Sequence, residues 1–177
     1  MTLPLAAAAD RWGIDRSLLE EWAWQGRLPP SLAQWSHADR CWLFGRSKAA
    51  GRSAERHATR GGLWLAGVDE QVCEVTAAWT DEIDSDGARC LRLDLVWWCI
   101  SSPVPALEAD SGDFATWCSD HPHGGAVTAR HHANVSEWYQ MLTAAGVPHS
   151  DPAYGTRVTV LWEHPEDWQP DRADPRT

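Results

Sequence analysis

The chain has 177 residues, of which 44% are hydrophobic and 23% are charged, and it holds 13 Trp against 2 Phe and 2 Tyr. This is the composition of an ordinary soluble globular protein, long enough for one medium domain or two small ones. The net charge of −10 is divided: residues 1–60 have a net charge of +3 and residues 61–177 a net charge of −13. Because phosphate repels the acidic part, nucleic acid would be bound by the first third.

The chain shows no membrane or export signal. No stretch approaches the ~20 apolar residues of a membrane span. The start, MTLPLAAAAD, has no basic residue before its apolar run and is interrupted by Asp10, so it reads as a helix start and not as a signal peptide. Five cysteines, with no Cys-x-x-Cys pair, indicate buried free thiols in a reducing compartment. We expect a cytoplasmic protein.

Two helices are predicted first. Helical spacing of apolar residues runs from Pro4 to Trp12, and Gly13 ends this helix. Asp15 is a good N-cap for a second helix of about ten residues. Gly26, followed by prolines, ends that helix.

Two short strands and a basic tract come next. Residues 31–45 predict two strands around a polar turn. Residues 46–62 hold five basic residues and one acid among Gly, Ala and Ser, which predicts either a flexible linker or a short exposed helix. The candidates for the inward face of the strands are Leu32, Trp35, Trp42 and Phe44.

Residues 63–163 predict a mainly antiparallel β domain with one packed helix. Strand candidates are LWLAGV, QVCEVTAAW, ARCLRLDLVWWCI and TRVTVLWE, with DEIDSDG as an acidic turn between the second and third. FATWC fits a strand or a short helix. The one helix begins at Asn134, ends before Gly146, and has an apolar stripe made of Val135, Trp138, Tyr139 and Leu142.

The sequence therefore predicts an α+β protein in four parts. These are a small head at 1–45, a basic linker at 46–62, an acidic Trp-rich β domain at 63–163 and a polar, proline-rich tail at 164–177.

Residues 3–45 resemble the winged helix-turn-helix of the MerR and excisionase type. The resemblance rests on LAAAADRWGIDRSLLEEWAWQGRLP, which gives an alanine-rich helix, a turn, a second helix and a Gly-Arg-Leu-Pro exit toward the wing. It implies that the start of the second helix enters the major groove and that the wing and the segment after it grip phosphate. The nucleic-acid-binding residues nominated in this way are Arg16, Ser17, Arg27, Arg40, Arg46, Lys48 and Arg52.

Glu20 and Glu21 depart from this family. They lie one turn further along the second helix, where members often carry basic residues. Two carboxylates facing a phosphate-lined groove are unfavourable unless they accept from cytosine amines or point away. The departure argues against reading of bases by this helix, while leaving the fold prediction intact.

A second group of residues raises the possibility of metal chemistry. Cys118, His121, His123, His131 and His132 lie close together in sequence and are of the types that transition metals prefer. Their spacing matches no usual zinc finger, which favours a polar surface loop with unpaired histidines. We therefore predict no metal, no cofactor and no catalytic residues.

Three functions remain open at this point. The first is a regulatory or accessory protein that contacts double-stranded DNA through its head, with the acidic domain serving protein contacts or self-association. The second is a protein-interaction subunit or nucleic-acid mimic that touches no DNA. The third is a small metal-dependent nuclease around residues 121–134, similar in residue types to the ββα-metal nucleases.

Overall fold

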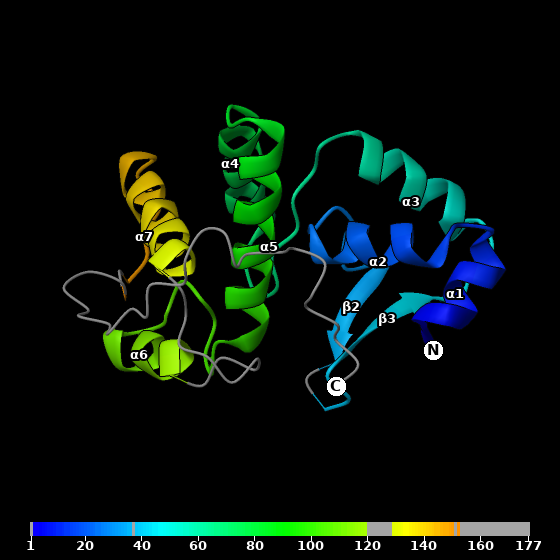
Figure 1. Cartoon of the computed structure of the whole chain (residues 1–177), viewed down its shortest axis with the longest axis horizontal. Coiled ribbons are helices and arrows are strands. Elements are labelled where there is room, and N and C mark those ends of the chain that lie inside the picture. The colour runs from blue at the N-terminus through cyan, green and yellow to red at the C-terminus, as the bar shows by residue number, and fades with distance from the viewer. Residues whose placement is uncertain (1, 37, 120–128, 151, 153–177) are drawn as a thin grey trace.

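The computed structural model describes residues 2–36, 38–119, 129–150 and 152 (Figure 1). Among them are seven helices and one small antiparallel sheet, so the chain is of mixed α and β structure. The sheet and the first three helices lie together, and four further helices form the other half, with α5 (Ser85–Ser101) between the two (Figure 1).

The first two helices form as expected. Helix α1 spans Leu5–Trp12 and ends at Gly13, which has a φ of 71°. Helix α2 spans Arg16–Trp24, and the Asp15 carboxylate caps it by accepting from the backbone N–H groups of Ser17 and Leu18 at 2.9 and 3.1 Å. The Ser17 hydroxyl donates to the same carboxylate, and this hydrogen bond is the main cause of the lowered pKa of Asp15.

The sheet has one strand more than the sequence predicts. Strands β2 (Ala33–Ser36) and β3 (Cys41–Gly45) form the expected hairpin, with Trp35 opposite Trp42. Strand β1 (Thr2–Pro4) pairs with the other edge of β3, which gives the order β1-β3-β2. Phe44 is fully buried against α1, and its ring meets the Trp12 ring edge-on at 5.7 Å.

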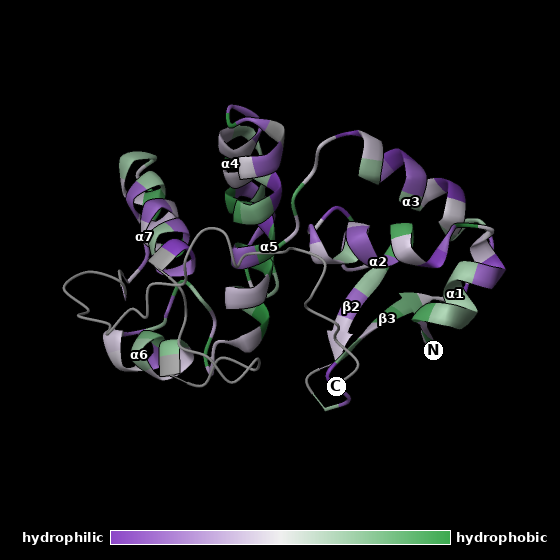
Figure 2. Cartoon of the chain, in the orientation of Figure 1, coloured by the Kyte–Doolittle hydropathy of each residue, from purple (hydrophilic) through white to green (hydrophobic). Residues whose placement is uncertain are grey.

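The basic tract contains helix α3 (Ala50–Thr59), so of the two forms predicted for it the structure shows the helix. Small residues cover the buried face: Ala54 and Ala58 are at most 2% exposed. Gly51 lets α3 approach α1 closely, since a Cβ there would lie 2.9 Å from the Trp12 Cβ. Figure 2 shows mostly hydrophilic residues along the rest of α3.

The second half of the described chain is helical, and the prediction of a mainly antiparallel β domain was wrong. Its elements are α4 (Glu70–Asp81), α5 (Ser85–Ser101), α6 (Ser111–Ser119) and α7 (Ala129–Ala144). The strand predicted at 156–163 and the tail at 164–177 lie outside the described residues.

Helix α4 replaces the strand predicted at QVCEVTAAW. The Asp69 carboxylate caps it by accepting from the Val72 N–H at 3.0 Å. The buried residues Val72, Thr76 and Thr80 recur every four positions, which is helical periodicity, and the threonine hydroxyls return hydrogen bonds to the preceding turn. The β-branched composition favoured the wrong assignment.

Helix α5 replaces the strand predicted at ARCLRLDLVWWCI, and it is buried on nearly every side. From Leu91 to Ile100 every residue is buried except Leu93 and Trp97, which are half-buried. A helix that packs against α2, α4 and α7 at once has no polar face, so its sequence loses the period of 3.6. The acidic segment before it is no hairpin tip: Asp84 caps α5 by accepting from Gly87 N–H at 3.0 Å.

The stripe predicted for α7 is confirmed, since Val135, Trp138, Tyr139 and Leu142 are each 0% exposed. The helix begins five residues earlier than predicted, so Asn134 lies inside it and is not its cap.

Buried tryptophans connect the helices of this half through their indole N–H groups. Trp98 on α5 donates to the Tyr139 hydroxyl at 2.9 Å, and Tyr139 donates in turn to the Ala106 carbonyl at 2.5 Å. Trp138 donates to the Thr76 hydroxyl of α4 at 3.0 Å. Each of these two buried indoles thus keeps a hydrogen-bond partner, as buried tryptophans usually do.

All five cysteines are free, as expected, and three of them are buried. In the described part of the chain, no helix is long and apolar enough to cross a bilayer.

Candidate functional site

Helix α2 lies against α5, so the second half of the chain covers part of its surface. The Glu21 carboxylate lies 3.4 Å from the Arg89 guanidinium of α5 and accepts from the Gln25 amide at 2.8 Å. The ring of Trp24 lies 5.8 Å from that of Trp97 on α5. In a helix-turn-helix the second helix enters the major groove. Beyond the first turn of α2, these side chains contact protein instead.

Trp24 is also the centre of a cluster of tryptophans that joins α2 to the hairpin. Its ring lies 5.4 Å from that of Trp35 on β2 and 5.8 Å from that of Trp42 on β3. Trp35 and Trp42 contact each other edge-on at 5.5 Å. With Trp97, the cluster fills the junction between the two halves of the chain. Its members are four of the 13 tryptophans of the sequence.

The end of α2 touches residues 60–69, the connecting segment between α3 and α4, at Gly26. Its φ is 64°, and a Cβ at this position would lie 2.7 Å from the Leu63 Cδ1 and 2.9 Å from the Trp64 carbonyl oxygen. The Trp64 N–H donates to the Gly26 carbonyl at 2.6 Å. Both the backbone conformation and the close approach therefore require glycine.

Arg92 of α5 holds the same segment from the other side. Its side chain is 3% exposed and donates to the carbonyls of Gly61 and Gly62 at 3.0 and 3.1 Å. It also donates to the Asp81 carboxylate at 2.7 Å. The guanidinium thus joins α4, α5 and the connecting segment through one planar group.

The seven predicted nucleic-acid-binding residues do not form one surface. Arg16 and Ser17 are exposed at the start of α2. Arg27 is half-buried and donates to the Ala58 carbonyl of α3 at 2.8 Å, which is a structural role. Arg40 lies in the turn of the hairpin, which projects from α2 on the side away from α3 in Figure 1.

The remaining three, Arg46, Lys48 and Arg52, are exposed just before α3 and at its start, and α3 is followed along its exposed face by two more cations that the residue-by-residue prediction missed. The exposed residues Arg52, Arg56 and Arg60 recur every four positions and therefore lie on one face of α3, opposite its buried alanines. Within the described residues, these three arginines form no salt bridge. The four-residue spacing of these arginines was the sequence signal that could have placed them on one helix face. We call these five exposed cations, which lie just before α3, along it and at its C-terminal end, the basic edge: Arg46, Lys48, Arg52, Arg56 and Arg60.

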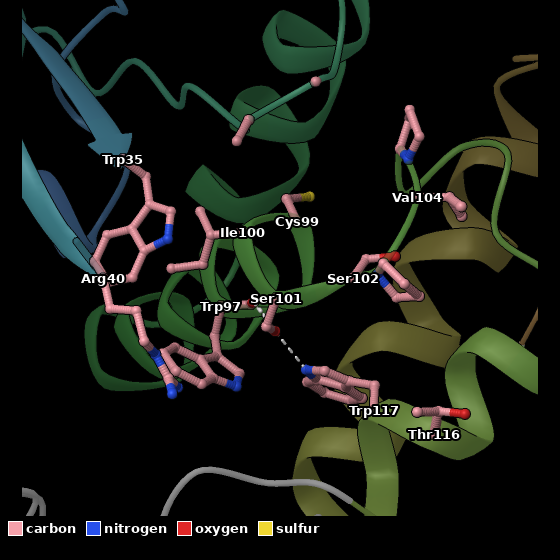
Figure 3. Close-up of a pocket in the computed structure, with 14 residues that line it drawn as sticks. Trp35, Arg40, Trp97, Cys99, Ile100, Ser101, Ser102, Val104, Thr116 and Trp117 are labelled. Carbon is pink, nitrogen blue, oxygen red and sulfur yellow. Dashed lines mark hydrogen bonds between the residues drawn. The ribbon is translucent and has the colours of Figure 1, made fainter. Parts of the chain in front are cut away.

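A groove of about 770 Å³ lies between the hairpin and the C-terminal part of α5 (Figure 3). Trp117 of α6 lies at its far side, with its indole N–H donating to the Ser101 hydroxyl at 2.7 Å. Arg40 has a φ of 50°, the one positive value among the described non-glycine residues. We call this cavity the tryptophan groove; its main lining residues are Trp35, Arg40, Trp97, Pro103, Pro105 and Trp117.

The junction, the basic edge and the tryptophan groove are the features of the described residues that bear most on function. The chain matches no family model, no curated protein and no solved structure. The support for a function comes from the side chains and charges of these features.

A buried polar cluster joins α5 to α7. Asp94 is 6% exposed, accepts from the Asn134 amide at 2.6 Å, and lies 3.6 Å from the Arg130 Nε and 3.3 Å from the His131 Nε2. Burial raises the pKa of Asp94 to about 6, against the opposing effects of the Arg130 charge and the Asn134 hydrogen bond. Asp94 lies in ARCLRLDLVWWCI, which the sequence predicted to be a strand, so its role was missed.

Only three members of the predicted cysteine and histidine cluster, Cys118, His131 and His132, lie among the described residues. Cys118 is buried, and burial raises the pKa of its thiol to about 12. His131 faces Asp94, and the His132 ring lies 5.3 Å from the Phe114 ring. His121 and His123 lie outside the described residues. Among the side chains that are described, no three His, Cys, Asp or Glu groups converge as metal ligands would.

Proposed function

We propose that the chain is a regulatory or accessory protein that contacts double-stranded DNA through a winged helix-turn-helix-like head, residues 1–45, and the basic tract at 46–62 that follows it. In this proposal the basic edge grips phosphates, and α2 does not read base sequence. The order of helix, turn, helix, hairpin and helix supports the head. The acidic remainder serves protein contacts or self-association.

The observation that carries the proposal is the one-sided charge of α3. Its alanine face is buried on α1, so Arg52, Arg56 and Arg60 point to solvent together. Each phosphate contact by such a cation releases condensed counterions, and this gives affinity without sequence reading. Arg16, at the exposed start of α2, is a candidate for a further phosphate contact.

The covered part of α2 limits what this head does. Glu21, Trp24 and Gln25 contact protein or one another and are not available to base edges. Backbone contacts alone position a protein on a duplex but carry no sequence information. We therefore expect similar affinity for unrelated duplex sequences.

The test is a titration of the full chain against duplex DNA at several salt concentrations. With three to five phosphate contacts, log K falls against log salt with a slope of about −3 to −5. Arg52→Ala with Arg56→Ala lowers the affinity and reduces the slope by about 2.

The matched control is Arg172→Ala with Arg176→Ala, which removes the same charge from the tail. It should leave affinity and slope nearly unchanged. Equal losses in the two double variants would show a general effect of net charge and would contradict a localised basic edge. A full chain without salt-dependent affinity would refute the proposal.

The covered surface of α2 favours a second candidate, an interaction subunit that touches no DNA. Here the head is a scaffold for the second half, and the acid-rich residues after 60 bind a basic surface on another protein. In that case the basic-edge variants have no effect on binding, whereas increasing salt weakens the complex with the basic partner.

A further inference from the structure

The tryptophan groove has the chemistry of a site for a proline-containing, acidic peptide. Trp35 and Trp97 offer apolar indole faces, and Pro103 and Pro105 form another part of its wall. Aromatic grooves of this kind bind extended proline-rich segments, whose backbone is already ordered before binding. The Arg40 guanidinium supplies a positive charge for a carboxylate on such a segment.

The last described residues contact the segment that directly follows the groove wall at Pro105. The Ser150 N–H donates to the Leu107 carbonyl at 3.0 Å, two residues after Pro105 in the groove wall. Nearby, the Tyr139 hydroxyl donates to the Ala106 carbonyl at 2.5 Å and its ring lies 5.3 Å from that of His149. Pro152, the last described residue, is buried. Residues after it therefore start near the segment that continues this groove wall.

The sequence of those residues complements the groove. Residues 164–177 read HPEDWQPDRADPRT, with prolines at every fifth position and a single tryptophan, Trp168. They hold four carboxylates against two arginines, so the segment is anionic, as a site with Arg40 requires. An extended segment rises about 3.1 Å per residue, so the eleven residues from 153 to 163 span up to about 34 Å.

We propose that residues 164–177 bind in the tryptophan groove of their own chain. Trp168 and the prolines pack against Trp35 and Trp97, and a tail carboxylate pairs with Arg40. Because the tail is tethered near the groove, its effective concentration is in the millimolar range, so weak contacts are sufficient. This inference is independent of DNA binding.

The test places photoreactive benzoylphenylalanine at position 168 of the full chain and maps the cross-links by mass spectrometry. We expect cross-links to the groove wall at Trp35, Trp97 or 103–105, within one chain, at a yield that does not change on dilution. Cross-links mainly to other surfaces, or only between two chains, would overturn the proposal. Cross-links spread over the chain without a preferred position would also overturn the proposal.

Charge reversal tests the role of Arg40. Arg40→Glu should reduce the groove cross-links by about fivefold, since an exposed ion pair contributes at most about 1 kcal/mol. Asp171→Arg in the Arg40→Glu background should restore part of the yield. The control Arg16→Glu makes the same charge change away from the groove and should have no effect. Equal yields from the chains carrying Arg40→Glu and Arg16→Glu would contradict the pairing.

Discussion

Replacing Gly26 by alanine tests whether the two halves of the chain meet as described. Two effects add at this position. A φ of 64° is unfavourable for any L side chain, by about 1–2 kcal/mol. The new Cβ would also lie 2.7 Å from Leu63 and 2.9 Å from the Trp64 carbonyl, and relieving such overlap costs about 1–3 kcal/mol. We expect Gly26→Ala to lower the free energy of unfolding by about 2–5 kcal/mol.

Gly13→Ala separates the two effects. Gly13 has nearly the same conformation, with a φ of 71°, but no atom lies within 4 Å of its would-be Cβ. Only the backbone effect applies there, so the loss should be about 1–2 kcal/mol. The difference between the two variants, about 1–3 kcal/mol, is the contribution of the close approach and corresponds to about 2–12 °C in Tm.

The assay is urea denaturation of both variants and the wild type, followed by tryptophan fluorescence. Gly146→Ala, also with a φ of 71° and open space, is a second control. Equal losses in the Gly26→Ala and Gly13→Ala variants would refute the close contact between α2 and the connecting segment.

Two further predictions concern buried charges. The carboxyl of Asp94 has a folded pKa of about 6, above its usual 3.8, so stability present below pH 3.8 is lost as pH rises to 6. Asp94→Asn should therefore gain about 3 kcal/mol relative to the wild type across this window, and a difference independent of pH in urea melts would contradict this. Arg92→Lys should cost about 2–4 kcal/mol, because one ammonium cannot replace the forked donation to Gly61, Gly62 and Asp81. Arg89→Lys, at an exposed pair, should change little, and equal losses would show that burial of Arg92 does not matter.

Sequence reasoning succeeded where the signals were local. Asp15 as a cap, Gly13 and Gly26 as helix ends, and the strands on either side of a polar turn depend on neighbours along the chain. Such signals depend on capping residues and on glycines at helix ends, which can be recognised from residue type and position alone. The stripe of α7 was visible for a similar reason, since that helix exposes its other face to solvent.

Sequence reasoning failed where burial came from distant elements. In α5, Leu91, Leu93 and Leu95 alternate with polar residues and imitate a strand. The alternating Arg92 and Asp94 are buried because each meets specific partners from other segments, Gly61 and Gly62 for one and α7 for the other. The contact between Trp24 and Trp97 could not be predicted from local sequence either, since Trp97 lies 73 residues further along the chain.

The tryptophan junction has a consequence for how the molecule folds and how it can be divided. Trp24, Trp35 and Trp42 pack against the same apolar core as α5, and only Trp42 also packs against the core of the first half, so the first sixty residues on their own would expose the indoles of Trp24 and Trp35. Such a fragment should aggregate or melt early, and the intact chain should unfold in a single cooperative transition and not as two separable units.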